Sequence, residues 1–180
     1  VMLVNNELGT VLPVAETARA IRAARCPALL HCDAVQGFLK VPFTPEGLGV
    51  DTLAVSGHKV HAPKGIGAMY IRKGLKISPF IRGGGQENGL RSGTEATAQI
   101  AGFAKAVELR TEGLEDKLRH MAEIKAYAKE QLSAIPDLVF VGRSDAPHIL
   151  SVSLVGWPSQ NIVNDLGSQG ICISAGSACH

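Results

Sequence analysis

Residues 50–71, VDTLAVSGHKVHAPKGIGAMYI, consist of two apolar runs separated by a polar turn that is rich in glycine and proline. The first run, residues 50–56, and the second, Gly67–Ile71, predict β-strands because each is short, apolar and bounded by turn residues. Lys59 lies at the mouth of the turn, just after the first run ends. A tight turn gives no advantage to a lysine that is merely solvated, so this position indicates a chemical use for Lys59.

The sequence on the N-terminal side continues the pattern of strands and turns. Apolar runs at residues 1–4 and 28–33 predict two further strands. Between them, apolar residues at helical spacing predict a helix that begins after Pro13 and ends before Pro27. A strand, a helix and then further strands are the order of elements in an α/β layer, so the sequence predicts an α/β fold.

The rest of the chain indicates a second, smaller part. An apolar stripe of helical period predicts a long amphipathic helix at residues 115–133, after a shorter helix at 96–108. Further along, the patterns predict strands at 137–142, 148–155 and 170–174, and a short helix at 161–169. The composition changes near Arg110, so we expect two domains, residues 1–110 and 111–180.

Composition and charge exclude several classes of function. The chain has 180 residues, 46% of them hydrophobic, and a formal net charge of +2. The chain has no long basic run of the kind that indicates nucleic-acid binding. It also has no stretch of about 18 apolar residues that would predict a membrane span. The four cysteines lack zinc-site spacing, so we expect free thiols in a cytoplasmic protein: Cys26, Cys32, Cys172 and Cys179. Both ends interrupt predicted segments, so we expect an internal piece of a longer protein.

Polar side chains gather where the first predicted strands end. Ligands of open α/β sheets bind outside the carboxyl ends of the strands, so these side chains are candidates for one organic ligand with several functional groups. Each of them alone would be an ordinary turn or cap residue, but their common placement favours a binding site. They are Asn5, Asn6, Asp33, Gln36, Ser56, His58 and Lys59.

The chemistry of this set matches pyridoxal phosphate. A partly desolvated lysine is the best amine for a Schiff base, and Lys59 is the candidate. A carboxylate such as Asp33 is the partner that a protonated pyridine nitrogen requires. Gln36 or Asn6 could hydrogen-bond the phenolic oxygen of the ring. Because lysines after strands are common, these residues alone leave the identification open.

Two loops add to this prediction. Ser56 and His58 could hold a phosphate, and the segment GGGQENGLRSGT, residues 83–94, offers backbone N–H groups, an arginine and hydroxyls that form an anion cradle. The alternative for that segment is a flexible surface loop. Cys179 lies in a loop of small residues, which favours a nucleophile. Two other cysteines lie in apolar runs and are predicted to be core residues: Cys32 and Cys172.

Five motifs, in this order, resemble those of the class I, NifS/IscS-like cysteine desulfurases, which are pyridoxal phosphate enzymes of fold type I. The motifs are NNELGTVLP (5–13), HCDAVQ (31–36), SGHKVHAPKGIGAMYIR (56–72), GGGQENGLRSGT (83–94) and SAGSAC (174–179). The last motif is the one that indicates class I. The resemblance covers nearly the whole chain, although residues 114–141 match by pattern more than by motif.

The resemblance implies a PLP-dependent transferase of fold type I. Residues 1–110 would be part of its large domain, and residues 111–180 part of its smaller C-terminal α+β domain. The family is homodimeric, and Thr94 would reach the phosphate of the partner subunit's cofactor. Lys59 would form the Schiff base with the cofactor, and Cys179 would carry the persulfide.

The matching positions also imply roles for the other candidate residues. Asp33 would pair with the pyridine nitrogen, and Gln36 with the phenolic oxygen of the ring. Asn6 would lie near the same oxygen and the substrate. Ser56 and His58 would bind the phosphate.

The implied activity is the conversion of L-cysteine to L-alanine, with the sulfur passed to an acceptor such as an iron–sulfur scaffold protein or used for tRNA thiolation.

The chain departs from the family at Val35, where threonine is frequent, and at residues 157–160, where a Gly-Glu pair is common. The family's upstream phosphate loop, ring-stacking histidine and downstream substrate-binding arginine have no counterpart in these residues. We therefore expect activity from the complete protein, and weak cofactor binding with little or no turnover from this piece alone.

Two alternatives remain. One is another fold-type I enzyme, such as a selenocysteine lyase or an aminotransferase, although a cysteine in the position of Cys179 disfavours an aminotransferase. The other is a catalytically inactive scaffold or sulfur-relay partner that folds without a cofactor.

Overall fold

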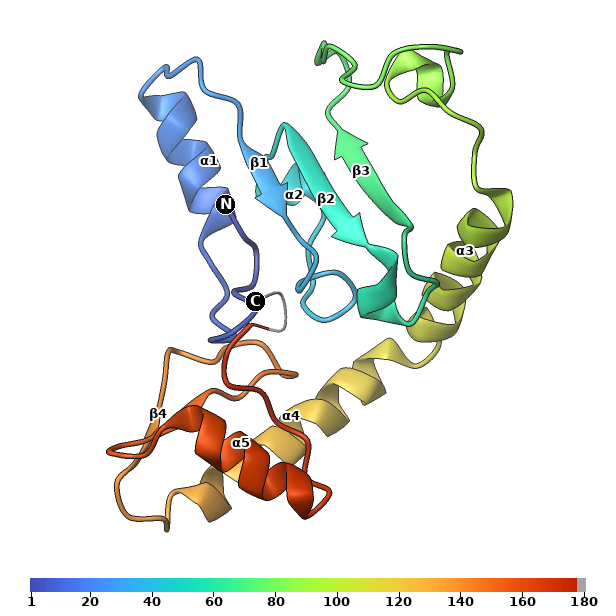
Figure 1. The fold of residues 1–180 in the computed structure, drawn as a ribbon. Helices are drawn as coiled ribbons and strands as arrows, with labels where there is room; N and C mark the ends of the chain where they lie inside the picture. Colours follow the sequence, from blue (N-terminus) through green and yellow to red (C-terminus); the bar gives the residue numbers. More distant parts are fainter. Residues whose placement is uncertain (178–180) are drawn as a thin grey trace. The chain divides into compact units, whose positions relative to one another are not determined.

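The computed structural model describes residues 1–177. The chain forms two compact units, and both are traced in Figure 1. The first unit comprises Val1–Met2 and Pro13–Glu112, and the second comprises Leu3–Leu12 and Gly113–His180. Both units mix helices with strands, which confirms the predicted α/β class. No helix in the described part of the chain is long and apolar enough to cross a membrane.

A three-stranded sheet in the order β1-β2-β3 organises the first unit. Its strands are β1 (His31–Asp33), β2 (Thr52–Ser56) and β3 (Gly67–Ile71). Strands β1 and β2 are parallel, with Asp33 opposite Ala54, whereas β3 runs antiparallel to β2 (Figure 1). The carboxyl ends of β1 and β2 therefore lie at the same edge of the sheet, and the chain after each strand enters a tight turn there.

The first unit contains three α-helices and two short 3₁₀-helices, which are α1 (Val14–Ala23), α2 (Pro45–Leu48), η1 (Gly57–Val60), η2 (Glu87–Gly89) and α3 (Thr97–Thr111). Helix α3 packs against η1. It also contacts the turn after β1, because the rings of Phe38 and Phe103 meet edge to face at 6.4 Å. A Cβ atom on Gly102 would come within 2.9 Å of Pro63, so this contact with the β2–β3 connection requires glycine. Helix α3 thus supports the turns that carry the candidate site residues.

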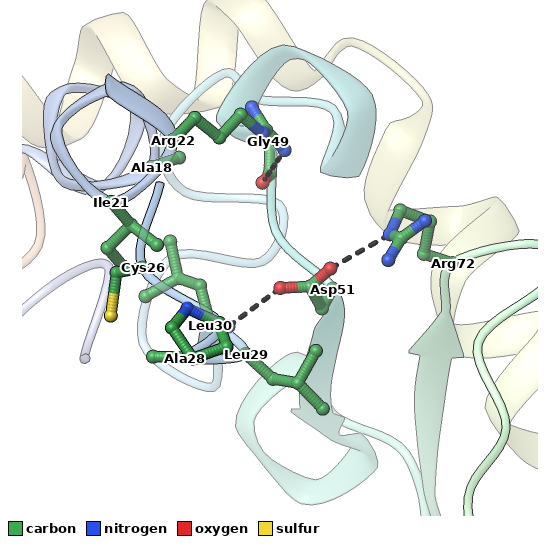
Figure 2. A pocket seen from close by; sticks show the side chains of 11 residues that line it. Ala18, Ile21, Arg22, Cys26, Ala28, Leu29, Leu30, Gly49, Asp51 and Arg72 are labelled. Atoms are coloured by element: carbon green, nitrogen blue, oxygen red, sulfur yellow. Dashed lines mark hydrogen bonds and ion pairs between the residues drawn. The ribbon is translucent and has the colours of Figure 1, made fainter. Parts of the chain in front are cut away.

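At the opposite edge of the sheet, Asp51 joins three segments of the first unit (Figure 2). Its carboxylate accepts a hydrogen bond from the Leu30 backbone N–H at 2.8 Å. It also forms an ion pair with Arg72, whose Nε lies 2.8 Å from the carboxylate. These two interactions lower the pKa of the Asp51 carboxyl group, the Leu30 hydrogen bond most of all. A cavity of about 220 Å³ adjoins Asp51. Arg22 also lines it and donates a hydrogen bond to the carbonyl of Gly49.

We expect Asp51→Ala to lower the free energy of unfolding of the complete protein by about 2 kcal/mol, because it removes a charged acceptor and leaves the Leu30 N–H unpaired. Since folding lowers the pKa of Asp51, this stabilisation is fully present above the ordinary carboxyl pKa and disappears as the pH falls through the lowered value. Urea denaturation at several pH values measures both effects. Glu16→Ala, which breaks the exposed ion pair with Arg19, is the control and should cost less than about 0.5 kcal/mol. Equal losses in the two variants would contradict the prediction.

The second unit is built on one long helix and a two-stranded antiparallel sheet. Its elements are α4 (Leu114–Leu132), β4 (Leu138–Phe140), β5 (Val152–Leu154) and α5 (Ser159–Ser168). Lys125 of α4 donates to the carbonyls of Ser144 and Ala146, and the Ala146 N–H donates to the carbonyl of Gly9 at 2.8 Å. These bonds attach the loop before β5 both to the helix and to the N-terminal segment of the unit.

Several local predictions from the sequence need correction. Residues 1–4 form only isolated bridges, Met2 with Asp33 and Val4 with Val11, because neither pairing extends into a ladder. Residues 170–174 are not a strand, since no described segment pairs with them. Cys172 is consequently exposed, whereas a core position was predicted for it. The same prediction is confirmed for Cys32, which lies in a paired strand and is fully buried.

Candidate active site

The parallel pairing of β1 with β2 brings five predicted site residues to one edge of the first unit. Asp33 ends β1 and Ser56 ends β2. The turn after β1 carries Gln36, and η1, which directly follows β2, carries His58 and Lys59. Amide, carboxylate, hydroxyl, imidazole and amine groups therefore share one edge of the sheet, as expected for strands whose carboxyl ends coincide.

Lys59 lies in a turn whose backbone is closely packed at Gly57. The Gly57 N–H donates to the carbonyl of Ile66 at 2.9 Å, and a Cβ atom on Gly57 would come within 2.9 Å of the Ile66 side chain. Only glycine fits this close approach. The Lys59 side chain is half-buried, and among the described residues it has no hydrogen-bond or ion-pair partner. An amine held in this way is available to a ligand.

Ser56 and His58 form a polar pair beside Lys59. The Ser56 hydroxyl and the His58 Nδ1 atom are 2.8 Å apart, a hydrogen bond whose direction depends on the imidazole tautomer. His58 is exposed and Ser56 is half-buried. The pair therefore presents a hydroxyl and a ring nitrogen to solvent at the end of β2, which are groups that suit an anion such as phosphate.

Asp33 and Gln36 lie on the turn that follows β1. The Val35 N–H donates to Asp33 Oδ1 at 2.9 Å, and among residues 1–177 no hydrogen bond to Oδ2 is found, so Oδ2 is available to a ligand. The Ala34 N–H donates to the carbonyl of Ala54 at 2.9 Å, which holds the start of the turn against β2. Both candidate side chains are half-buried, so they can contact a ligand without first being exposed by a rearrangement.

Lys40 belongs to the same edge, although no sequence motif singled it out. Its ammonium group donates to Gln36 Oε1 at 3.2 Å, and the residue is only 8% exposed. Burial, and then the positive charges of Arg110 and Lys59, lower the pKa of Lys40 to about 8. The one signal in the sequence was the spacing of four residues from Gln36, which is too common to be informative on its own.

Asn6 lies in the second unit, in a loop that its neighbour Asn5 shapes. The Asn5 side chain accepts hydrogen bonds from the backbone N–H groups of Glu7 and Leu8 at 3.0 and 2.8 Å. Asn6 Nδ2 donates to the hydroxyl of Ser177 at 3.2 Å. The structure thus joins the first and last of the five sequence motifs, which are 171 residues apart at this contact. Cys179, the predicted nucleophile, lies outside the described residues.

Thr94 ends the glycine-rich loop of the first unit and is exposed. The loop is closed by the Gly93 N–H, which donates to Gln86 Oε1 at 3.0 Å, and by the Ser92 N–H, which donates to the carbonyl of Ile81 at 3.2 Å. In the described part of the chain, no hydrogen bond links Thr94 to the residues at the ends of β1 and β2. The same part of the chain contains no cluster of ligating side chains suited to a metal ion.

Comparisons with a family model, with curated relatives and with solved structures agree on the family of this chain. The aminotransferase class-V family model matches residues 1–180. The chain is 39% identical to the cysteine desulfurase IscS of Dictyoglomus turgidum over 99% of the chain and 46% of that protein. It is 37% identical to a cysteine desulfurase of a Nostoc species, over 99% of the chain and 45% of that protein. Among solved structures, a NifS-like protein superposes with a TM-score of 0.90 at 39% identity, over 96% of this chain and 48% of that one.

The chain therefore spans about half the length of the relatives that it matches, and the similarity extends over almost all of its own residues. The fold agrees as well, because the match to the NifS-like structure covers 96% of this chain. This chain belongs to the aminotransferase class-V family.

Proposed function

We propose that the complete protein is a pyridoxal phosphate-dependent cysteine desulfurase, which converts L-cysteine to L-alanine and retains the sulfur as a persulfide on Cys179. The observation that carries the proposal is the half-buried amine of Lys59, which has no partner in the described residues and shares one edge of the sheet with Asp33. Similarity to cysteine desulfurases over 99% of the chain supports the same activity.

The residues at this edge fit pyridoxal phosphate by their chemistry. The Lys59 amine is the group that would hold the cofactor aldehyde, and the available Asp33 Oδ2 would accept the proton of the pyridine nitrogen. Gln36 would meet the phenolic oxygen, and the Ser56–His58 pair would bind the phosphate. When bound, pyridoxal phosphate supplies an electron sink for the charge that develops on the substrate carbon.

The chain's own residues would carry out the proton and sulfur transfers. Lys59 Nζ would take the proton from the substrate Cα. The thiolate of Cys179 attacks the substrate sulfur. The bond between the substrate Cβ and its sulfur breaks, and the electron pair of that bond stays with Cβ. A sulfur–sulfur bond forms on Cys179. The Cβ carbon would take up a proton equivalent to the one that the Cys179 thiol gave up, and Lys59 would return a proton to Cα. Alanine would then leave, so the step needs no external oxidant or reductant.

The remaining roles extend the proposal. Residues 1–110 would be part of the large, cofactor-binding domain, although Leu3–Leu12 group with the second unit. Residues 111–180 would be the part of the small domain that carries the cysteine loop. The enzyme is a cytoplasmic homodimer in which the exposed Thr94 reaches the phosphate bound by the partner subunit. Asn6 contacts substrate or cofactor. The persulfide passes to an acceptor protein, such as a scaffold for iron–sulfur clusters.

A single-turnover experiment tests the proposal. The complete protein, loaded with pyridoxal phosphate, is mixed with L-cysteine in the absence of reductant. We expect one equivalent of L-alanine per site, and mass spectrometry should find one added sulfur atom on the peptide that contains Cys179.

Parallel reactions distinguish the alternatives. Turnover of L-selenocysteine without turnover of L-cysteine would indicate a selenocysteine lyase. Amino transfer to a 2-oxo acid, without alanine formation from L-cysteine, would indicate an aminotransferase. Absence of any cofactor absorbance band would support the inactive scaffold. Each of these outcomes would overturn the desulfurase proposal.

A further inference from the structure

The buried ammonium group of Lys40 stands out because it has only one partner in the described residues. That partner is a neutral amide oxygen, Gln36 Oε1, at 3.2 Å. Lys40 is 8% exposed, and no carboxylate of the described chain pairs with it. Lysine is almost never buried to this extent without an opposite charge. Such a residue costs the fold stability, which suggests that it is retained for another reason.

The turn that contains Lys40 does not depend on its side chain. The carbonyl of Ala34 accepts hydrogen bonds from the backbone N–H groups of Gly37 and Phe38. The carbonyl of Gly37 in turn accepts from the N–H groups of Lys40 and Val41 at 3.0 Å. These backbone bonds close the turn whatever side chain occupies position 40. A purely structural role for the ammonium group is therefore poorly supported.

The ammonium group determines which way the Gln36 amide faces. A lysine ammonium has three donors and no acceptor, so the amide atom that it contacts must be the oxygen. The NH₂ group of Gln36 then points away from Lys40. A ligand that reaches the half-buried Gln36 therefore meets a hydrogen-bond donor.

We propose that Lys40 is a positioning residue that holds the Gln36 amide with its NH₂ group toward the ligand, so that position 36 recognises a hydrogen-bond-accepting oxygen and favours its anionic form. The inference rests on the proposed function, in which this oxygen is the phenolic oxygen of pyridoxal phosphate. It assigns a role to a residue that does not itself touch the cofactor.

The electrostatic surroundings of Lys40 agree with this role. The charged groups that lower its pKa are Arg110 on α3 and Lys59 on η1, and burial contributes more than either. With a pKa of about 8, Lys40 is mostly protonated at neutral pH and remains a donor to Gln36. Three cations near one edge also favour an anionic ligand there.

A double-mutant cycle on cofactor affinity tests the proposal. The variants of the complete protein are Lys40→Met, Gln36→Ala and the double variant, and equilibrium dialysis of each apoprotein against pyridoxal phosphate gives the dissociation constant. We expect each single variant to raise that constant about tenfold, the loss of one hydrogen bond. The double variant should match Gln36→Ala alone, because Lys40 acts only through Gln36.

Two further measurements separate positioning from structure. The absorbance maximum of the bound cofactor should shift in the same direction in Lys40→Met and Gln36→Ala, since both weaken donation to the same oxygen. Lys40→Met should unfold at the same urea concentration as the wild type or at a higher one, because it removes an unpaired buried charge. Lys64→Met, at an exposed lysine of the β2–β3 connection, is the control and should leave both measurements unchanged.

The outcomes are distinct for the two proposals. If the wild-type protein binds no pyridoxal phosphate, the proposed function fails. If the wild type binds but Gln36→Ala binds equally well, position 36 does not contact the cofactor and the positioning role is wrong. If the factors by which the two single variants raise the dissociation constant multiply in the double variant, Lys40 acts independently of Gln36. The inference is then likewise overturned.

Discussion

Replacement of Lys59 by alanine in the complete protein is expected to lower the turnover of L-cysteine by at least about 10³-fold, because one side chain both holds the cofactor and moves the substrate proton. The described residues offer no substitute at this position. The ammonium group of Lys40 donates a hydrogen bond to Gln36, and Lys64 is exposed on the following turn. A steady-state assay of alanine production, combined with the visible spectrum of the bound cofactor, measures the loss.

The spectrum identifies the cause of the defect. In Lys59→Ala the absorbance band of covalently held cofactor should be absent, and borohydride should no longer fix the cofactor to the protein. Lys64→Ala is the matched control, because it removes a lysine from the same connection and should keep both the band and the activity. An unchanged band in Lys59→Ala would contradict the assignment of Lys59.

Replacement of Cys179 by serine is expected to abolish persulfide formation while leaving cofactor binding intact. The hydroxyl of serine is a far weaker nucleophile toward sulfur than a thiolate, so we expect sulfur transfer to fall by at least about 10³-fold. The dissociation constant and absorbance band of pyridoxal phosphate should be unchanged. Mass spectrometry after incubation with L-cysteine, and a sulfide assay in the presence of reductant, measure the loss.

Cys172 provides the matched control for this experiment. It is an exposed cysteine close to Cys179 in the sequence, so Cys172→Ser tests whether the loss of any accessible thiol in this segment impairs sulfur transfer. We expect Cys172→Ser to form the persulfide at the wild-type rate. Persulfide on Cys172 in the Cys179→Ser variant would show that the nucleophile was wrongly assigned.

These two predictions divide the reaction into separable halves. Lys59→Ala should eliminate the covalent cofactor and every later step, whereas Cys179→Ser should eliminate only the sulfur transfer. A protein in which both variants lose the cofactor band would not work by the proposed mechanism.

Local sequence patterns predicted much of the secondary structure. Strand Gly67–Ile71 was predicted with its exact bounds, because Gly65 and Arg72 interrupt an apolar run of suitable length. The long amphipathic helix was predicted to within a residue at each end, because its apolar stripe continues without interruption to Leu132. The predicted strand at residues 170–174 was wrong for a physical reason. A strand requires a neighbour with free backbone groups, and its own sequence cannot supply one.

The strand-end positions of several candidate residues were predictable, because they follow from local patterns along the chain. Asp33, Ser56 and Lys59 could each be placed at the end of a predicted strand, and the chemical types together indicated the ligand. Lys40 was not predictable, because its importance comes from burial and from the group that its ammonium meets. The contact between Asn6 and Ser177 joins two loops from opposite ends of the chain, and no local pattern indicates such a pairing.

The sequence by itself determined the class of fold, the strand ends that carry functional groups, and the family resemblance, because these depend on residue type and spacing along the chain. Only the tertiary structure decided that β1 and β2 run parallel and bring their ends to one edge, and that Cys172 is exposed while Lys40 is buried. Pairing direction and burial depend on the neighbours that a segment meets after folding. Those neighbours are distant in sequence, so the physical basis of the Lys40–Gln36 contact appears only once the chain is folded.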